Sequence, residues 1–102
     1  NARTMYQQYI SGAENGAKGY NGLALCDIAD GDYDSALSNI SSGIPSATTE
    51  EMQSLLFNEI VVYEKKLDFA TAQQKAQEYV EMFPDDKAAQ KELAFLKTRT
   101  GQ

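Results

Sequence analysis

The feature that most constrains the fold of this chain is a short pattern that occurs twice, 36 residues apart. Gly31-Asp32-Tyr33 and Leu67-Asp68-Phe69 each place a turn residue, an aspartate and an aromatic residue in succession, and an alanine follows three residues later. Aspartate accepts hydrogen bonds from the free backbone N–H groups that begin a helix, and glycine suits the left-handed position that follows one. A tight turn that occurs twice between helical segments predicts a chain built from repeated helix pairs.

Apolar residues recur at helical spacing on both sides of these turns. Thr48 and Glu51 have the spacing of a capping box, whereas residues 41–49, with Gly43 and Pro45 as breakers, are expected to form a loop. Residues 54–63 contain the β-branched and aromatic side chains of a strand, but the cap before them and the length of the segment favour a helix. We therefore expect an all-helical chain, with helices over residues 3–11, 16–30, 33–43, 49–66, 69–83 and 86–99.

The same spacing extends beyond the two turns. Tyr20 pairs with Leu56 at an offset of 36, and Tyr6 pairs with Ile40 at an offset of 34. With this phase the chain resembles the tetratricopeptide repeat (TPR) family, in which units of about 34 residues each form two antiparallel helices. The residues that agree with the family motif are Tyr20, Leu23, Ala24, Ala36, Ile40, Gly43, Tyr63, Ala72, Pro84, Leu93 and Ala94. Asp27 departs from the motif, because it stands where an aromatic residue is expected.

The resemblance implies an all-α fold, an α-α superhelix (TPR-like solenoid) of about six antiparallel helices in a single domain, 1–102. Its parts would be the second helix of a partial repeat (3–11), two repeats (16–46 and 49–84) and a closing helix (86–99). Small residues are expected where helix axes approach closely, at Ala24, Ala36, Ala72 and Ala94. A single unit cannot bury its apolar face alone, so the end helices are expected to expose apolar surface or to pair with another copy of the chain, giving a homo-oligomer.

The charge of the chain excludes some classes of partner. The formal net charge is −6, and no Lys or Arg lies between Gly19 and Glu64, a segment with eight acidic residues. Nucleic-acid binding needs a cationic face, so no nucleic-acid partner is expected. A solvated acidic face is the first interpretation, and an anionic surface for a basic partner is the alternative. No run of about 18 apolar residues occurs, so we expect no membrane insertion by this segment.

Few residues in the chain could carry chemistry. There is no histidine and the only cysteine, expected to be a small buried thiol, is Cys26, so a Cys/His metal site or nucleophile system is excluded. Residues 12–18 suggest a phosphate loop but lack its Lys-Ser/Thr ending. Asp30, Asp32 and Asp34 suggest a calcium loop, but Ser35 stands where that loop needs glycine. We therefore expect no enzyme activity, no cofactor and no metal.

The remaining candidate is a surface. In TPR proteins the first helix of each pair lines a concave groove, and the resemblance places eight residues of this chain there: Asn21, Leu25, Ile28, Phe57, Asn58, Val61, Lys91 and Phe95. This would be an apolar groove edged with amides that takes an extended or helical segment. Packing of Leu25, Ile28 and Val61 between helices is the alternative. Some TPR domains bind acidic C-terminal tails, but only Asn58 fits their pattern here, so no such binding is expected.

These observations predict a non-catalytic protein–protein interaction scaffold that binds a peptide or protein segment in its concave groove. The alternative is a structural spacer or self-association segment of a longer helical-repeat protein, whose groove would be covered by flanking repeats or by a second copy. Nothing in the sequence identifies the partner or the cellular compartment.

Overall fold

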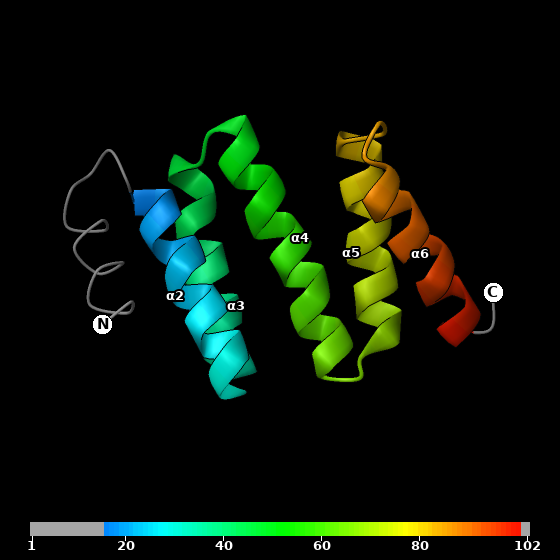
Figure 1. The fold of residues 1–102 in the computed structure, drawn as a ribbon, viewed down its shortest axis with the longest axis horizontal. Helices are drawn as coiled ribbons and strands as arrows, with labels where there is room; N and C mark the ends of the chain where they lie inside the picture. The colour runs from blue at the N-terminus through cyan, green and yellow to red at the C-terminus, as the bar shows by residue number, and fades with distance from the viewer. Residues whose placement is uncertain (1–15, 101–102) are drawn as a thin grey trace.

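In a computed structural model, the chain is described over residues 16–100, and this part contains five α-helices and no strand. The elements, labelled as in Figure 1, are α2 (Gly16–Asp30), α3 (Tyr33–Gly43), the short 3₁₀ helix η2 (Ile44–Ser46), α4 (Thr49–Lys65), α5 (Phe69–Met82) and α6 (Lys87–Thr100). The all-α prediction is confirmed, including the ambiguous residues 54–63. The helix number is five in the described part instead of about six, since the helix predicted at 3–11 lies outside the described residues.

The two tight turns share one geometry. Asp32 accepts a hydrogen bond from the backbone N–H of Ser35 at 3.3 Å, and Asp68 accepts one from that of Thr71 at 3.2 Å. The residue before each aspartate has a left-handed backbone conformation, with a φ of 78° at Gly31 and 63° at Leu67. The predicted helix caps are therefore confirmed, and the second turn places a leucine in a conformation that favours glycine.

The entry into α4 is also capped as predicted. The backbone N–H of Glu51 donates to Thr48 Oγ1 at 3.2 Å, and the Glu51 carboxylate accepts from the backbone N–H of Thr48 at 2.9 Å. The helix predicted over 33–43 is confirmed, whereas the loop predicted over 41–49 is wrong for residues 41–46, because α3 continues through Gly43 and η2 follows at once. Pro45 lies at the start of η2, where a fixed φ and a missing N–H are tolerated.

Successive helices run in opposite directions and pack in chain order. Figure 1 shows α3 lying behind α2, with α4 at the centre of the molecule and α5 and α6 beyond it. Helix α4 packs against both α2 and α3, α5 packs against α4, and α6 packs against α5. Every helix within residues 16–100 is too short or too polar to span a lipid bilayer.

The core consists of two clusters that meet at α4. One contains Ala17, Ala24, Ala36, Ile40, Leu55 and Val62 from α2, α3 and α4. The other contains Ile60, Ala72, Ala76, Tyr79, Ala89, Leu93 and Leu96 from α4, α5 and α6. Since α4 contributes Leu55 and Val62 to one cluster and Ile60 to the other, it joins the two halves of the molecule.

Small residues allow close packing at most of the predicted positions. Ala24, Ala36 and Ala72 are fully buried. A Cβ on Gly43 would lie 3.1 Å from the Tyr20 Cβ and 3.2 Å from Leu55 Cδ1, so a side chain there requires these neighbours to shift by a few tenths of an ångström.

Two burial predictions are wrong. Ala94 is exposed, because α6 packs on α5 through the opposite face, which carries Ala89, Leu93 and Leu96. Cys26 is only partly buried, because the buried face of α2 runs through Leu23, Ala24 and Asp27 instead.

Asp27 occupies a core position as a buried polar residue. Asp27 is only 2% exposed, and its Oδ2 accepts a hydrogen bond from Asn39 Nδ2 at 2.7 Å. A buried carboxylate requires such a partner, and here the bond joins α2 to α3.

Candidate functional site

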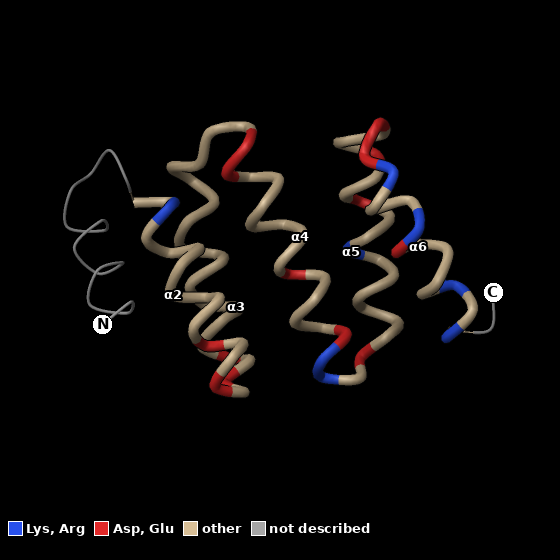
Figure 2. Tube along the Cα trace, viewed as in Figure 1, with Lys and Arg blue, Asp and Glu red and all other residues tan. Residues whose placement is uncertain are grey.

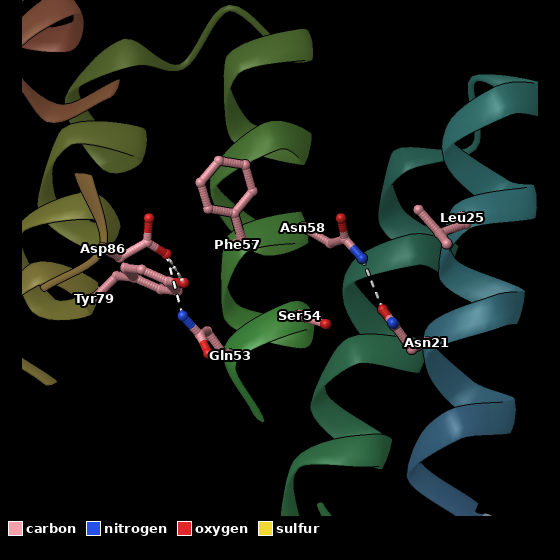
Figure 3. Close-up of a pocket in the computed structure, with 8 residues that line it drawn as sticks. All are labelled: Asn21, Leu25, Gln53, Ser54, Phe57, Asn58, Tyr79 and Asp86. Carbon is pink, nitrogen blue, oxygen red and sulfur yellow. Dashed lines mark hydrogen bonds between the residues drawn. The ribbon is translucent and has the colours of Figure 1, made fainter. Parts of the chain in front are cut away.

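A hollow of ≈ 380 Å³ lies between α2 and α4 and extends to the turn before α6. Helix α2 contributes Asn21 and Leu25 to it, and α4 contributes the largest share of its wall. The lining residues, drawn in Figure 3, are Asn21, Leu25, Gln53, Ser54, Phe57, Asn58, Tyr79 and Asp86. The hollow therefore combines amides, one carboxylate and two hydroxyls with apolar and aromatic surface.

The structure brings together four of the eight predicted groove residues, Asn21, Leu25, Phe57 and Asn58. The other four do not line this hollow. Ile28 packs against the core cluster that α2, α3 and α4 share, and Val61 is half-buried on α4. Lys91 and Phe95 are exposed on α6.

Sequence reasoning missed four lining residues, Gln53, Ser54, Tyr79 and Asp86. Gln53 and Ser54 precede Phe57 and Asn58 by one helical turn, so the period of α4 could have placed them on the same face. Tyr79 and Asp86 come from α5 and from the turn that follows it. Their position depends on how α5 and α6 pack against α4, for which the sequence carries no local signal.

An amide pair connects the two walls of the hollow. Asn58 Nδ2 on α4 donates a hydrogen bond to Asn21 Oδ1 on α2 at 2.7 Å, and Figure 3 shows the two side chains pointing toward each other. An amide side chain offers two donor hydrogens and an acceptor oxygen with two lone pairs. This bond uses one donor of Asn58 and one acceptor site of Asn21, so the pair retains the groups that recognise a peptide backbone.

The opposite end of the hollow is fixed by Tyr79 and Asp86. The Tyr79 hydroxyl donates to Asp86 Oδ2 at 2.6 Å, and Gln53 Nε2 donates to the same oxygen at 3.2 Å. The second oxygen, Oδ1, accepts from the backbone N–H of Ala89 at 3.1 Å and so caps α6. Asp86 thus ties α4, α5 and α6 together.

These bonds set the protonation states. The hydrogen bond from Tyr79, followed by that from the Ala89 backbone, lowers the pKa of Asp86. Burial, together with the bond to Asp86, raises the pKa of Tyr79 to about 12. At neutral pH Asp86 is therefore a carboxylate and Tyr79 a neutral donor. A general acid or base must gain and lose a proton readily near pH 7, and neither Asp86 nor Tyr79 does so.

Aromatic packing forms the floor of the hollow. The Phe57 ring meets the Tyr79 ring edge-on, with centroids 5.8 Å apart and planes at 75°. The Tyr79 ring also packs against Phe83, at 5.0 Å. Leu25, 48% exposed, lies on the α2 side. The rings hold Phe57 in place, so the apolar part of the hollow has a defined shape.

A second group of carboxylates lies outside the hollow. The pKa of Glu64 is raised to about 8, first by burial, then by a hydrogen bond and charge repulsion from Glu92. The pKa of Glu59 is also raised, by burial, although Lys75 lies 3.9 Å away and opposes this effect. In residues 16–100 no group of three or more His, Cys, Asp or Glu is arranged to hold a metal ion.

Comparisons of the chain with family models, with curated proteins and with solved structures give no match.

Proposed function

We propose that this chain is a non-catalytic scaffold of the TPR-like, α-α superhelical type, and that it binds a segment of a protein partner in the hollow between α2 and α4. The observation that carries the proposal is the hollow itself. It places the half-exposed Leu25 and the ring of Phe57 beside the Asn21–Asn58 amide pair. Apolar surface next to backbone-recognising amides suits a peptide.

The size and chemistry of the hollow support binding over catalysis. Its ≈ 380 Å³ is at the lower end of the range of about 300–1,000 Å³ for ligand sites, large enough for one or two side chains of a peptide. Its titratable side chains, Tyr79 and Asp86, bind each other and have pKa values displaced away from neutrality. The hollow thus offers recognition groups without an activated acid, base or nucleophile.

The test is a binding experiment with a matched pair of variants. Leu25→Glu places a charge in the hollow at a side chain that is already half-exposed, so the fold should tolerate it. Met82→Glu is the control, since Met82 is 56% exposed and does not line the hollow. Proteins captured from a native lysate by wild type would be identified, and their binding segments measured as purified peptides by calorimetry.

The proposal expects a peptide that binds wild type and Met82→Glu equally but binds Leu25→Glu at least about tenfold more weakly, because burying an unpaired charge is costly. Phe57→Glu, checked for folding by circular dichroism, should abolish the same binding. A peptide that binds all folded variants equally would refute the groove as the site.

A structural or self-association role is the second candidate, and one observation favours it. The outer face of α6 exposes Phe95, 43% accessible, between exposed basic residues. A further repeat or a second copy that packed against this face would cover Phe95.

A further inference from the structure

The charges of the described residues are separated along the chain. Helix α6 carries four cations, Lys87, Lys91, Lys97 and Arg99, and one acid, Glu92, which gives a net charge of +3. Residues 16–86 carry four cations and thirteen acids, a net charge of −9. Figure 2 shows the basic residues gathered along α6, whereas acidic residues dominate the end of the α2–α3 pair and the start of α4. One end of the molecule is therefore complementary in charge to the rest.

The basic residues of α6 form a stripe with an aromatic residue in it. Lys87, Lys91, Phe95 and Arg99, here called the α6 stripe, are four residues apart and all exposed, so they follow one face of the helix. The Arg99 Cζ lies 5.1 Å from the centre of the Phe95 ring, within the range of a cation–π contact. The buried residues of α6 lie on the opposite side. Within residues 16–100, α6 packs chiefly on α5.

The hollow has the complementary chemistry. It continues into a recess of ≈ 260 Å³ that shares Asn21 and Ser54 with it and is also lined by Lys18, Glu50 and Glu51. Counting Asp86, the hollow and recess contain three carboxylates and one cation. Leu25 and Phe57 provide the apolar surface. An aromatic residue flanked by cations would therefore meet both an apolar slot and an acidic rim.

We propose that the occupant of the hollow is α6 of a second copy of this chain, with Phe95 against Leu25 and Phe57 and the cations of the α6 stripe facing Glu50. This inference rests on the proposed function and names the partner of the same site. Pairing of two α6 stripes with each other would oppose like charges, which costs binding energy. Each copy has one stripe and one hollow, so two-fold pairing closes both contacts into a dimer.

The dimensions of the molecule are sufficient for such an interface. The principal extents are 43 × 28 × 17 Å, so its broad face exceeds the roughly 800 Å² per partner that a stable complex buries. Charge complementarity at the rim should make association depend on salt, because exposed charges are screened beyond about 10 Å at 0.1 M.

A charge-swap experiment tests the proposal. Variant A, Lys87→Glu with Lys91→Glu, reverses the α6 stripe. Variant B, Glu50→Lys with Ser54→Lys, makes the hollow basic. The control, Lys65→Glu with Lys97→Glu, changes the net charge as variant A does, at exposed positions outside the stripe. Analytical ultracentrifugation of each, with circular dichroism to confirm folding, gives the dissociation constants at low and high salt.

The proposal expects wild type and control to self-associate and A and B alone to associate at least about tenfold more weakly. An equimolar mixture of A and B should regain the wild-type affinity to within about threefold, since each contact then joins opposite charges again. A monomeric wild type at millimolar concentration, or association unaffected in both A and B, would overturn the inference. If the wild type is monomeric but binds a foreign peptide, and Leu25→Glu does not bind that peptide, only this inference is overturned. If the wild type neither self-associates nor binds a peptide, the proposed function is overturned too.

Discussion

Leu67 has a left-handed backbone conformation, and we predict that replacing it with glycine stabilises the protein while the reverse change at Gly31 destabilises it. The two residues occupy the same place in the two tight turns, at φ 63° and 78°. A residue with a Cβ in this conformation costs about 1–2 kcal/mol relative to the right-handed one, and glycine avoids that cost. The two turns therefore provide an internal comparison of one backbone position.

The magnitude follows from the surroundings of each residue. At Leu67, glycine relieves about 1–2 kcal/mol of strain but loses about 0.5–1 kcal/mol through the entropy of the unfolded chain. Leu67 is 74% exposed, so truncation forfeits only about 0.5 kcal/mol of burial. The midpoints of these ranges leave a net stabilisation of about 0.25 kcal/mol, and the most favourable combination gives about 1 kcal/mol. At Gly31 nothing lies within 4 Å of an added Cβ, so that atom gains no contact to offset the strain, and Gly31→Leu should cost about 1 kcal/mol.

Thermal and urea unfolding of the two variants beside wild type would measure these changes. In a domain of this size about 1 kcal/mol corresponds to about 4–8 °C in Tm, so Leu67→Gly should raise Tm by about 1–2 °C and Gly31→Leu should lower it by about 4–8 °C. Leu67→Asn is a useful third variant, because asparagine tolerates the left-handed region without the entropy cost of glycine. If Leu67→Gly and Leu67→Asn were both destabilising, backbone strain at residue 67 would not govern the stability of this turn, and the prediction would be wrong.

Three further changes test other parts of the structure. Because the pKa of Glu64 is raised to about 8 in the fold, stability that its protonated form contributes below pH 4.5 is lost as pH rises toward 8. With Glu64→Gln, the fall in unfolding free energy between pH 5 and 8 should be smaller by about 1 kcal/mol, allowing for solvent screening. Urea unfolding at a series of pH values measures this fall, and an unchanged pH profile would contradict the prediction. Tyr79→Phe removes a donor to the Asp86 carboxylate, so it should lower the unfolding free energy by about 2 kcal/mol and raise the pKa of Asp86 in an NMR titration. An unchanged unfolding free energy would show that this bond adds nothing to stability. Gly43→Val forces a side chain against Tyr20 Cβ and should lower the unfolding free energy by about 1–3 kcal/mol, whereas an unchanged Tm would mean that the helices separate freely there.

Helix boundaries in this chain were predictable because short-range chemistry sets them. Asp32, Asp68 and the Thr48–Glu51 pair each bond to backbone groups three residues away, and a contact over three residues is visible in the sequence. The exception is instructive. Gly43 and Pro45 suggested a loop, but both tolerate helical φ values, and the close approach of Tyr20 and Leu55 explains the glycine instead.

The composition of the hollow was only partly predictable, because it depends on contacts between distant residues. Asn21 and Asn58 are 37 residues apart and Gln53 and Asp86 are 33 apart. A repeat phase gives the face of each helix, which is why four groove residues were placed together. It does not give the angle between helices, so it could not bring in the Tyr79–Asp86 pair from α5 and the following turn.

The position of α4 connects the fold to the site. Leu55 and Val62 anchor it to the α2–α3 cluster and Ile60 anchors it to the α5–α6 cluster, while its remaining face carries Phe57 and Asn58 into the hollow. Polar bonds reinforce both anchors, through Asn58 to α2 on one side and through Gln53 to Asp86 on the other. Any shift of α4 toward one cluster must therefore strain the packing of the other, since both are closely packed. The width of the hollow is thus set by two cores at once, so the segment that we propose to bind there would require little ordering of the hollow.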